Sequence, residues 1–408
     1  MEFLKRVHAK NILKWGKTNE KAIVLSGDLT TSCEIDEFRN AYPERFLSLG
    51  LMEQNMMSFA AGLAREGLIP MVHTFSVFMY RRALDQIEMS IAYPNLPVKF
   101  FGFLPGVTTP GGASHQALND IAVMRSLPNM SIIETGDATD VESVLELSKN
   151  INGPVYIRMI RGEIPRLFSK DDPTIFSKAR ILSHGSDIAL FTSGICTEES
   201  LLVTNLLREK GITIQHLHIT TLKPFDDCLI DEAVTKVKYG IITMENHTSV
   251  GGLGTCVAEL IAKSGLPRKL IKIAINDTYL HGASKNYLMN EYKINAKVVV
   301  LAASACESAR ILLNSKSPYH ENGLGNSSNM VGKYLHDSTG TNNMAFIPDL
   351  MNRKTYNEDG MGNMHLYSPW WLDNKNLDFP RGYHIEIYGG LGAPSYGTGF
   401  NFNSLNSF

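Results

Sequence analysis

Short apolar runs alternate with helical patterns along the first 165 residues. Buried strands are predicted at 22–28, 71–75, 98–103, 130–135 and 155–160. Helical patterns separate them, notably over Glu53–Arg65, Arg81–Ala92, Ala117–Arg125 and Asp140–Lys149. Strands that alternate with helices form parallel, doubly wound sheets. The pattern therefore predicts a first α/β domain over residues 1–165.

A second α/β pattern follows a polar segment. Residues 166–178 contain Asp172-Pro173 and no sustained periodicity, which predicts a linker. Apolar runs then recur at 187–194, 213–219, 240–247 and 270–275, with helical patterns between them. We therefore expect a second doubly wound, mostly parallel sheet over residues 179–296.

The pattern changes again in the last part of the chain. Residues 321–408 hold 13 Asn and 12 Gly, and Trp370 and Trp371 are adjacent. Beyond residue 321 neither the helical nor the strand period is sustained. We expect a loop-rich C-terminal fragment that packs poorly by itself.

Composition narrows the classes of function. A chain of 408 residues with 44% hydrophobic residues can hold two or three domains. A formal net charge of −2 provides no electrostatic footprint for nucleic acid or an anionic membrane. The five cysteines lie far apart without CxxC spacing, so neither a zinc site nor a disulfide framework is indicated. The N-terminal residues lack an apolar signal-peptide core and no apolar run could span a bilayer, which predicts a cytoplasmic protein.

The segment RFLSLGLMEQNMMSFAAGLAREG places one carboxylate, Glu53, at the start of an apolar helix. A short strand and a turn at Gly50 precede it. Apolar surroundings desolvate a carboxylate and raise its pKa, which is typical of a group that handles protons. The simpler interpretation is an ordinary acid in the first turn of a helix, stabilised by the helix N-terminus.

Aromatic and glycine-rich segments supply further candidates. Phe75 and Phe78 are three apart and meet on one helix face, either as core or as a flat wall for a heteroaromatic ring. In GVTTPGGASHQALND, glycines let the backbone approach a ligand closely. His115 in this loop either caps a helix or exchanges protons with a substrate.

Polar residues also follow two strands. Asp28 and Ser32, in SGDLTTS, either form a turn and cap or provide polar ligands at the sheet edge. Arg158 and Arg161 end another strand, where a guanidinium suits phosphate or carboxylate unless it faces solvent. ENHTSVGGLG does not match the dinucleotide fingerprint and is interpreted as a structural loop that contacts a neighbouring subunit.

Five segments together resemble the transketolase family: GDLTTS, GLMEQNM, HTFSVFMYRRALDQI, GGASHQALNDIAVMRSLPNM and YIRMIRGEIP. They follow the family's order over residues 1–296, as its pyrimidine-binding domain and then its C-terminal domain. Split transketolases carry this pair of domains on a separate subunit. The resemblance implies a thiamine diphosphate enzyme of carbohydrate metabolism, such as the pentose phosphate pathway. Such an enzyme transfers a two-carbon ketol unit from a ketose, commonly phosphorylated, to an aldose.

The resemblance implies a set of cofactor contacts. Glu53 would lie against N1′ of the aminopyrimidine and act as the catalytic acid. Phe75 and Phe78 would form the stacking wall, with Arg81 beside it, and Asp28 matches an acid of the cofactor pocket.

The resemblance also implies substrate contacts. His115 matches a catalytic histidine that contacts substrate oxygens, while Ser32 and Arg161 match the substrate phosphate site, to which Arg6 would add. Pro110-Gly111-Gly112 stands where the family commonly has an acidic G-E-D-G, and Phe103-Leu104 where it has a phosphate-contacting His. An unusual ketose or acceptor is therefore compatible with the sequence.

The family's diphosphate-binding motif, GDG followed by NN, does not occur in this chain. Mg²⁺ requires oxygen ligands in near-octahedral geometry, and the chain offers no recognisable set. The resemblance therefore implies no metal ligand here and an N-terminal partner subunit that carries GDG…NN and holds Mg²⁺. It also implies a dimer of such units.

The segment from Ala296 onward, AKVVVLAASACESARILLNSK, opens a second resemblance. Residues 297–408 are similar to an internal fragment of glucose–methanol–choline (GMC) oxidoreductases, without that family's FAD fingerprint or catalytic His. We expect no bound FAD and interpret the join as a fusion or an artefact.

Two alternatives stay open. One is the β-type subunit of a 2-oxoacid dehydrogenase or a relative of deoxyxylulose phosphate synthase, although Ser32, His115-Gln116 and Arg161 favour transketolase. The other is a non-catalytic assembly or regulatory subunit, or an artefactual chimera.

Overall fold

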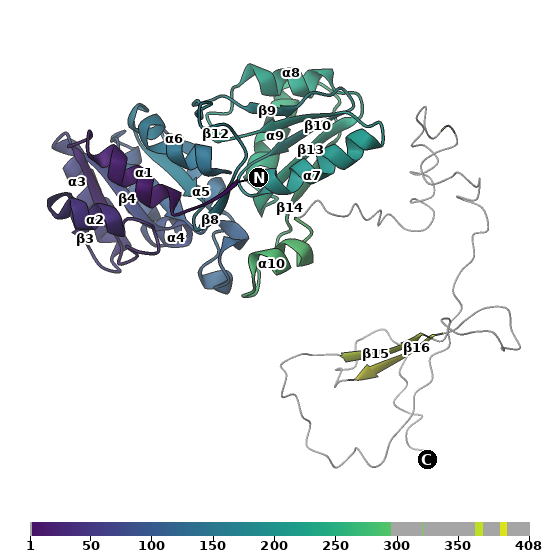
Figure 1. The fold of residues 1–408 in the computed structure, drawn as a ribbon, viewed down its shortest axis with the longest axis horizontal. Coiled ribbons are helices and arrows are strands. Elements are labelled where there is room, and N and C mark those ends of the chain that lie inside the picture. The colour runs from purple at the N-terminus through teal and green to yellow at the C-terminus, as the bar shows by residue number, and fades with distance from the viewer. Residues whose placement is uncertain (1, 295–320, 322–363, 370–383, 390–408) are drawn as a thin grey trace, which may run out of the picture. The chain divides into compact units, whose positions relative to one another are not determined.

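The computed structural model describes residues 2–294, 321, 364–369 and 384–389. The chain divides into two units, Met1–Tyr334 and Leu335–Phe408, and each is described by itself. The first unit contains two α/β arrangements in succession, drawn from purple to blue and from teal to green in Figure 1. Both sheets are mostly parallel, which confirms the predicted fold class for this part of the chain.

The first sheet has seven strands in the order β12-β6-β7-β5-β4-β2-β3. Their bounds are β2 Ala22–Ser26, β3 Phe46–Ser48, β4 Ile69–Phe75, β5 Lys99–Phe103, β6 Ser131–Glu134, β7 Val155–Met159 and β12 Thr221–Lys223. Six of them run parallel, and β12 is antiparallel to β6. Because β12 comes from the part of the chain beyond the predicted linker, this sheet joins the two domains.

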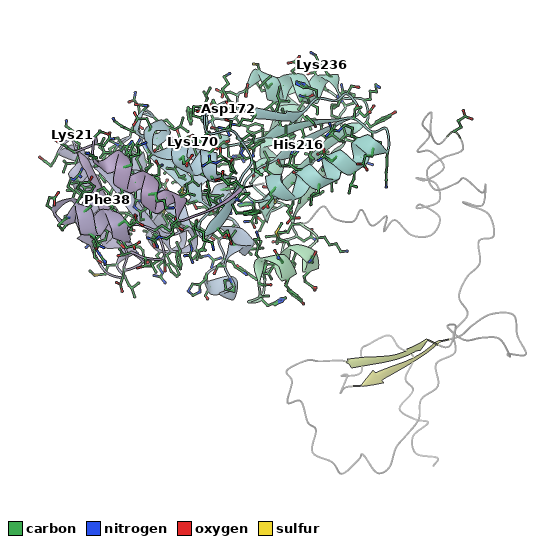
Figure 2. The ribbon with its side chains drawn as sticks, viewed as in Figure 1. Lys21, Phe38, Lys170, Asp172, His216 and Lys236 are labelled. Atoms are coloured by element: carbon green, nitrogen blue, oxygen red, sulfur yellow. The ribbon has the colours of Figure 1, made fainter. Side chains whose placement is uncertain are left out.

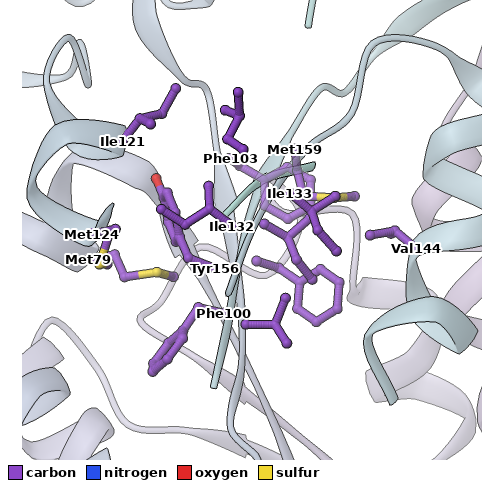
Figure 3. Packing of buried hydrophobic residues seen from close by; sticks show 14 of the residues in the cluster. Met79, Phe100, Phe103, Ile121, Met124, Ile132, Ile133, Val144, Tyr156 and Met159 are labelled. Atoms are coloured by element: carbon purple, nitrogen blue, oxygen red, sulfur yellow. The ribbon is translucent and has the colours of Figure 1, made fainter. Parts of the chain in front are cut away.

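Helices cover both faces of the first sheet. Their bounds are α1 Val7–Gly16, α2 Asp36–Ala41, α3 Glu53–Arg65, α4 Ser76–Gln86, a π-helix η2 Ile87–Ala92, α5 Asp120–Ser126 and α6 Ala138–Lys149. Figure 3 shows Met79, Met124 and Tyr156 on one side of the strands and Val144 on the other. Successive strand residues point to opposite faces of the sheet, so the apolar residues of β6 pack toward the helices on both faces.

The helix predicted from Arg81 begins earlier and is not continuous. The structure starts α4 at Ser76, and Ala83 inside it has non-helical angles of φ −133° and ψ 25°. The π-helix η2 then continues to Ala92. Such distortions re-aim the side chains of neighbouring turns and often lie at functional sites.

The remaining short elements of the first domain include an antiparallel pair, β1 Glu2–Lys5 with β8 Glu163–Arg166. The sequence pattern does not predict this pair, because four exposed or mixed residues have no clear period. Single turns of 3₁₀-helix are η1 Pro43–Arg45, η3 Gly106–Thr108 and η4 Gly112–Ser114.

The second sheet has five strands in the order β14-β13-β10-β11-β9. Their bounds are β9 Arg180–Ser183, β10 Ile188–Thr192, β11 Ile214–His218, β13 Gly240–Thr248 and β14 Leu270–Ile275. Only β9, which the sequence analysis missed, is antiparallel among these described strands. The helices of this part are α7 Cys196–Glu209, α8 Cys228–Lys236, α9 Leu253–Ser264 and α10 Lys285–Glu291.

A fully buried guanidinium lies where the two sheets meet. Arg158, on β7, donates to Asp120 from Nε at 2.7 Å and to Glu134 from Nη1. Its Nη2 donates to the carbonyl of Asn246 in the second domain at 3.1 Å. Arg158 is therefore part of the domain junction, whereas Arg161 is exposed. The Asn246 side-chain amide also accepts a hydrogen bond from the Val107 N–H and donates one to the Pro105 carbonyl. The segment ENHTSVGGLG, predicted as a structural loop, therefore begins with contacts to other residues of this chain.

Buried histidines predict acid sensitivity of the second domain. His216, on β11 (Figure 2), hydrogen-bonds Thr192 at 2.9 Å, and burial, with His218 as a smaller cause, lowers its pKa to about 3. The unfolded chain then binds the proton more readily between about pH 3 and 6.5, so stability is complete above pH 6.5 and falls with acidification. Protonation of His216 in the unfolded chain should lower the free energy of unfolding by about 2 kcal/mol between pH 6.5 and 5. We expect this contribution to be absent in His216→Gln.

Urea unfolding at a series of pH values checks this prediction. The matched control is His184→Gln, because His184 is exposed and the same substitution there should leave the pH slope unchanged. Equal slopes in His216→Gln and the unmodified chain would contradict the prediction.

The second unit contains one antiparallel strand pair, β15 Met364–Pro369 with β16 His384–Gly389, among its described residues. This pair was not predicted from the sequence. The GMC-like segment, 297–408, lies mostly outside the described residues, so that resemblance and the proposed domain boundaries stay predictions. Across the part of the chain that the structure describes, no helix is both long and apolar enough to cross a bilayer.

Candidate active site

The predicted site residues follow the carboxyl ends of neighbouring parallel strands. In the sheet register Ser26, at the end of β2, is paired with Ser48 at the end of β3 and with His73 near the end of β4. Parallel strands place their carboxyl ends at one edge, where ligands of open α/β sheets bind. The segments that carry Asp28, Glu53 and Phe75 therefore meet at this edge.

Glu53 is the first residue of α3 and is 3% exposed. Its Oε1 accepts a 2.6 Å hydrogen bond from Nη1 of Arg82, a residue that the sequence analysis did not single out. Oε2 accepts no hydrogen bond from any residue that the structure describes. Burial disfavours a charged carboxylate, while the helix N-terminus and the guanidinium favour it.

The aromatic pair lies at the start of α4, and Arg82 connects it to this carboxylate. Phe75 precedes the helix and Phe78 lies in its first turn, with ring centroids 5.6 Å apart and planes 26° from parallel. The Arg82 guanidinium lies 3.8 Å from the Phe78 centroid, which connects the pair to Glu53. Phe78 is only half-buried, so its ring remains available on a surface and is not simply core.

His115 reaches the same aromatic pair from the glycine-rich loop. Its ring meets Phe78 edge-on at 5.3 Å and Phe75 at 6.5 Å. Its Nδ1 is 2.9 Å from the Ser114 hydroxyl. A Cβ at Gly111 would come within 2.8 Å of His115, so glycine is needed there for this loop path.

Arg81 holds this loop. Its guanidinium donates to the carbonyls of Ala113 at 2.8 Å and Gln116 at 3.3 Å, and to the Tyr80 hydroxyl at 3.0 Å. These bonds fix the segment that carries His115. The structure thus gives Arg81 a loop-holding position, and its predicted contact with a cofactor stays a prediction.

Asp28 follows the end of β2 in a left-handed conformation, φ 64°. Its side chain is exposed. A Cβ built on the preceding Gly27 would lie 3.6 Å from Met56 Cε and 3.7 Å from the Gly50 carbonyl. The residue before Asp28 is therefore close to the turn at Gly50 and to the Met56 side chain of α3.

Arg6 and Arg161 lie at a corner around buried Glu34, and Ser32 is two residues before Glu34 in the chain. The Gly162 N–H donates to Glu34 Oε1 at 2.9 Å, and the Arg6 N–H donates to the Gly162 carbonyl at 3.2 Å. Burial raises the pKa of Glu34, and Arg6 and Arg161 oppose that shift. Arg6 already pairs with Asp36 at 2.7 Å. Among the described residues the exposed Arg161 has no ion pair, which suits it to an incoming anion.

The structure supplies groups that suit an organic cofactor ring. An aromatic face, a buried carboxylate with one unengaged oxygen and the orphaned buried hydroxyl of Thr74 suit an aminopyrimidine. Within the described ranges, no group of three or more His, Cys, Asp or Glu side chains could hold a metal ion.

Comparison with known families identifies the class of protein. Residues 5–166 match "Transketolase, pyrimidine binding domain", and residues 177–299 match "Transketolase, C-terminal domain". The chain belongs to the transketolase family, whose members depend on thiamine diphosphate.

Several relatives are similar to this chain over most of their own length. A putative transketolase C-terminal section from Methanocaldococcus jannaschii is 35% identical over 299 residues, 72% of this chain and 93% of the relative. A 6-deoxy-6-sulfo-D-fructose transketolase subunit from Clostridium is 32% identical over 302 residues, 74% and 93%. A solved split gene transketolase, described as an inactive beta4 tetramer, has a TM-score of 0.66 and 35% identity, covering 71% of this chain and 93% of that one. The chain is thus similar to C-terminal subunits of split transketolases.

Proposed function

We propose that this chain is the C-terminal subunit of a split transketolase and transfers a two-carbon ketol unit from a ketose to an aldose. The observation that carries the proposal is the meeting of Glu53, the Phe75–Phe78 pair and His115 at one sheet edge. A proton-transferring carboxylate beside a stacking wall is what an aminopyrimidine requires. Bound thiamine diphosphate supplies a carbon nucleophile and an electron sink.

The chain's own residues would act as follows. Glu53 holds and returns a proton at N1′ of the aminopyrimidine, while Phe75 and Phe78 orient the ring. His115 contacts substrate oxygens above the aromatic pair. Asp28 and Arg81 contribute to the cofactor pocket, the latter through the loop that it holds.

Substrate recognition is assigned to the corner around Glu34. Arg161, Ser32 and, more weakly, Arg6 would bind a phosphate or another anionic group of the sugar. The names of two relatives include a sulfo sugar and apulose-4-phosphate, so related subunits serve different anionic sugars. Pro110-Gly111-Gly112 removes the family's usual acid from this chain, which is consistent with a departure from common pentose phosphates.

The proposal includes a partner subunit that carries GDG…NN and holds Mg²⁺ and the diphosphate, in a dimer of such units. The relatives' names, a C-terminal section and subunits, support this arrangement. The solved relative, a tetramer of one chain type, is described as inactive. The GMC-like tail has no part in the proposed reaction, and a cytoplasmic location and the absence of FAD stay predictions.

Reconstitution tests the proposal. We expect the purified chain with thiamine diphosphate and Mg²⁺ to show no ketol transfer, and addition of a diphosphate-binding subunit to produce transfer from a ketose phosphate to an aldose phosphate. Turnover by the chain alone would refute the partner requirement. Decarboxylation of a 2-oxoacid in place of ketol transfer would favour the deoxyxylulose phosphate synthase or dehydrogenase alternative; a synthase from Natranaerobius thermophilus is 30% identical, with this chain covering 47% of it.

A further inference from the structure

Arg82 connects the buried carboxylate of the candidate site to its aromatic pair. On α4, Arg82 is four residues after Phe78, so the two side chains share one helix face. The guanidinium carbon lies 3.8 Å from the Phe78 ring centroid, and Nη1 lies 2.6 Å from Glu53 Oε1. Arg82 is thus held on one side by a ring face and on the other by a carboxylate.

The surroundings make this contact stronger than a surface ion pair. The Glu53 side chain is 2% exposed, whereas that of Arg82 is 44% exposed. A desolvated carboxylate needs a compensating donor, and a charge-assisted hydrogen bond is roughly twice as strong as a neutral one. Among the described residues, Arg82 is the only cation within ion-pair distance of Glu53. Because Arg82 itself is half in solvent, its removal leaves no cavity in the core.

The two carboxylate oxygens of Glu53 have different surroundings. Oε1 is taken by Arg82, and Oε2 has no hydrogen-bond partner among the described residues. A planar guanidinium can stack on a ring and donate in its own plane at the same time, which an ammonium cannot do. The carboxylate plane is therefore fixed while one oxygen remains for a ligand.

We propose that Arg82 is the positioning residue for Glu53: it anchors Oε1, leaves Oε2 for the aminopyrimidine nitrogen, and stabilises the carboxylate after its proton has moved to that nitrogen. This inference rests on the proposed function. With the cofactor bound and Glu53 protonated, the Oε2–H bond would break as an N1′–H bond forms, so Glu53 would become negative while it pairs with Arg82. The proton returns by the reverse path, and no other reactant takes part.

Three variants of the full chain test the role. Arg82→Met removes the charge at similar length, Arg82→Lys restores charge without the stacked plane, and Arg65→Met is the matched control. Arg65 is exposed at the other end of α3 and has no ion pair or side-chain hydrogen bond to any described residue. In the enzyme assembled with its partner, NMR measures how fast the C2 proton of bound thiamine diphosphate exchanges with D2O. We expect Arg82→Met to slow exchange about 10- to 100-fold, the factor expected for a hydrogen bond to a charged group.

The remaining expectations separate positioning from general damage. Arg82→Lys should recover part of the exchange rate, Arg65→Met should match the unmodified enzyme, and kcat should fall in Arg82→Met while KM for the sugar is unchanged. An exchange rate in Arg82→Met equal to that of the unmodified enzyme would overturn the proposal. Loss of exchange together with a lowered Tm in both Arg82 variants would also overturn it, in favour of a structural role.

A readout without cofactor keeps this test distinct from that of the proposed function. The infrared carboxylate stretch of Glu53 is isolated by subtracting the spectrum of Glu53→Gln from that of the chain alone. We expect the band to shift in Arg82→Met and not in Arg65→Met, because the bond to Oε1 is lost only in the former. A shift without any C2 exchange in the unmodified assembly would refute the proposed function, while an unshifted band would refute the role of Arg82.

Discussion

Glu53→Gln is expected to lower the kcat of the assembled enzyme by about 10²- to 10⁴-fold, the usual contribution of general acid–base catalysis. Glutamine keeps the size of the side chain and can still accept a hydrogen bond from Arg82, but it cannot give up a proton to a ring nitrogen. Glu53 is buried at the start of α3, where Arg82 connects it to Phe78, so water cannot readily take over its role as proton donor. Steady-state ketol transfer with the partner subunit measures the effect.

The control for this variant is Glu66→Gln. Glu66 is exposed immediately after the last turn of α3, so the same chemical change on the same helix should leave kcat unchanged. Thermal unfolding should be similar for the two variants, because Arg82 is partly solvated and tolerates a neutral partner. Retention of ordinary turnover by Glu53→Gln would show that the carboxylate takes no part in the chemistry.

The largest effect on stability is expected from Arg158→Ala, about 3–5 kcal/mol in the free energy of unfolding, as for other buried ion pairs that lose one partner. Arg158 is fully buried and pairs with Asp120 and Glu134. Its removal leaves two carboxylates in the interior without a counter-charge, and it removes donors from the carbonyls of Ala117 and Asn246. The second domain would therefore lose part of its attachment to the first.

Urea unfolding at neutral pH measures this loss. Arg39→Ala is the matched control, because Arg39 is exposed on α2 and bonds only to its neighbour Asn40 among the described residues. We expect that control to change the free energy of unfolding by less than about 0.5 kcal/mol, the usual range for a surface substitution. Similar values for the two variants would show that the buried cluster does not hold the domains together.

The two arginines on α4 divide the support of the site between them. Arg81 holds the loop of His115 through backbone carbonyls, and Arg82 holds the carboxylate of Glu53. Adjacent residues on a helix point about 100° apart, so one helix can support two different segments. This explains how a single element positions both the group proposed for the cofactor and the group proposed for the substrate.

Long periodic elements could be predicted from the sequence with little error. The helix Glu53–Arg65 is found with the predicted bounds, because its polar start and apolar face are both local signals. The strand predicted at 71–75 lies within β4, and that at 155–160 covers β7. Short elements were missed where pairing alone creates them. The three residues of β12 form a strand only because β6 offers an open edge.

The sequence by itself determined the two parallel-sheet domains and the candidates Glu53, Phe75, Phe78 and His115, because buried strands, helix periods and motif residues are local properties of the chain. Only the tertiary structure decided that Arg82 binds Glu53, that Arg81 holds a loop and that Arg158 is buried between domains. An arginine in a sequence has the same charge wherever it lies. Its role depends on which carboxylate, ring or carbonyl the fold brings within about 3 Å of it.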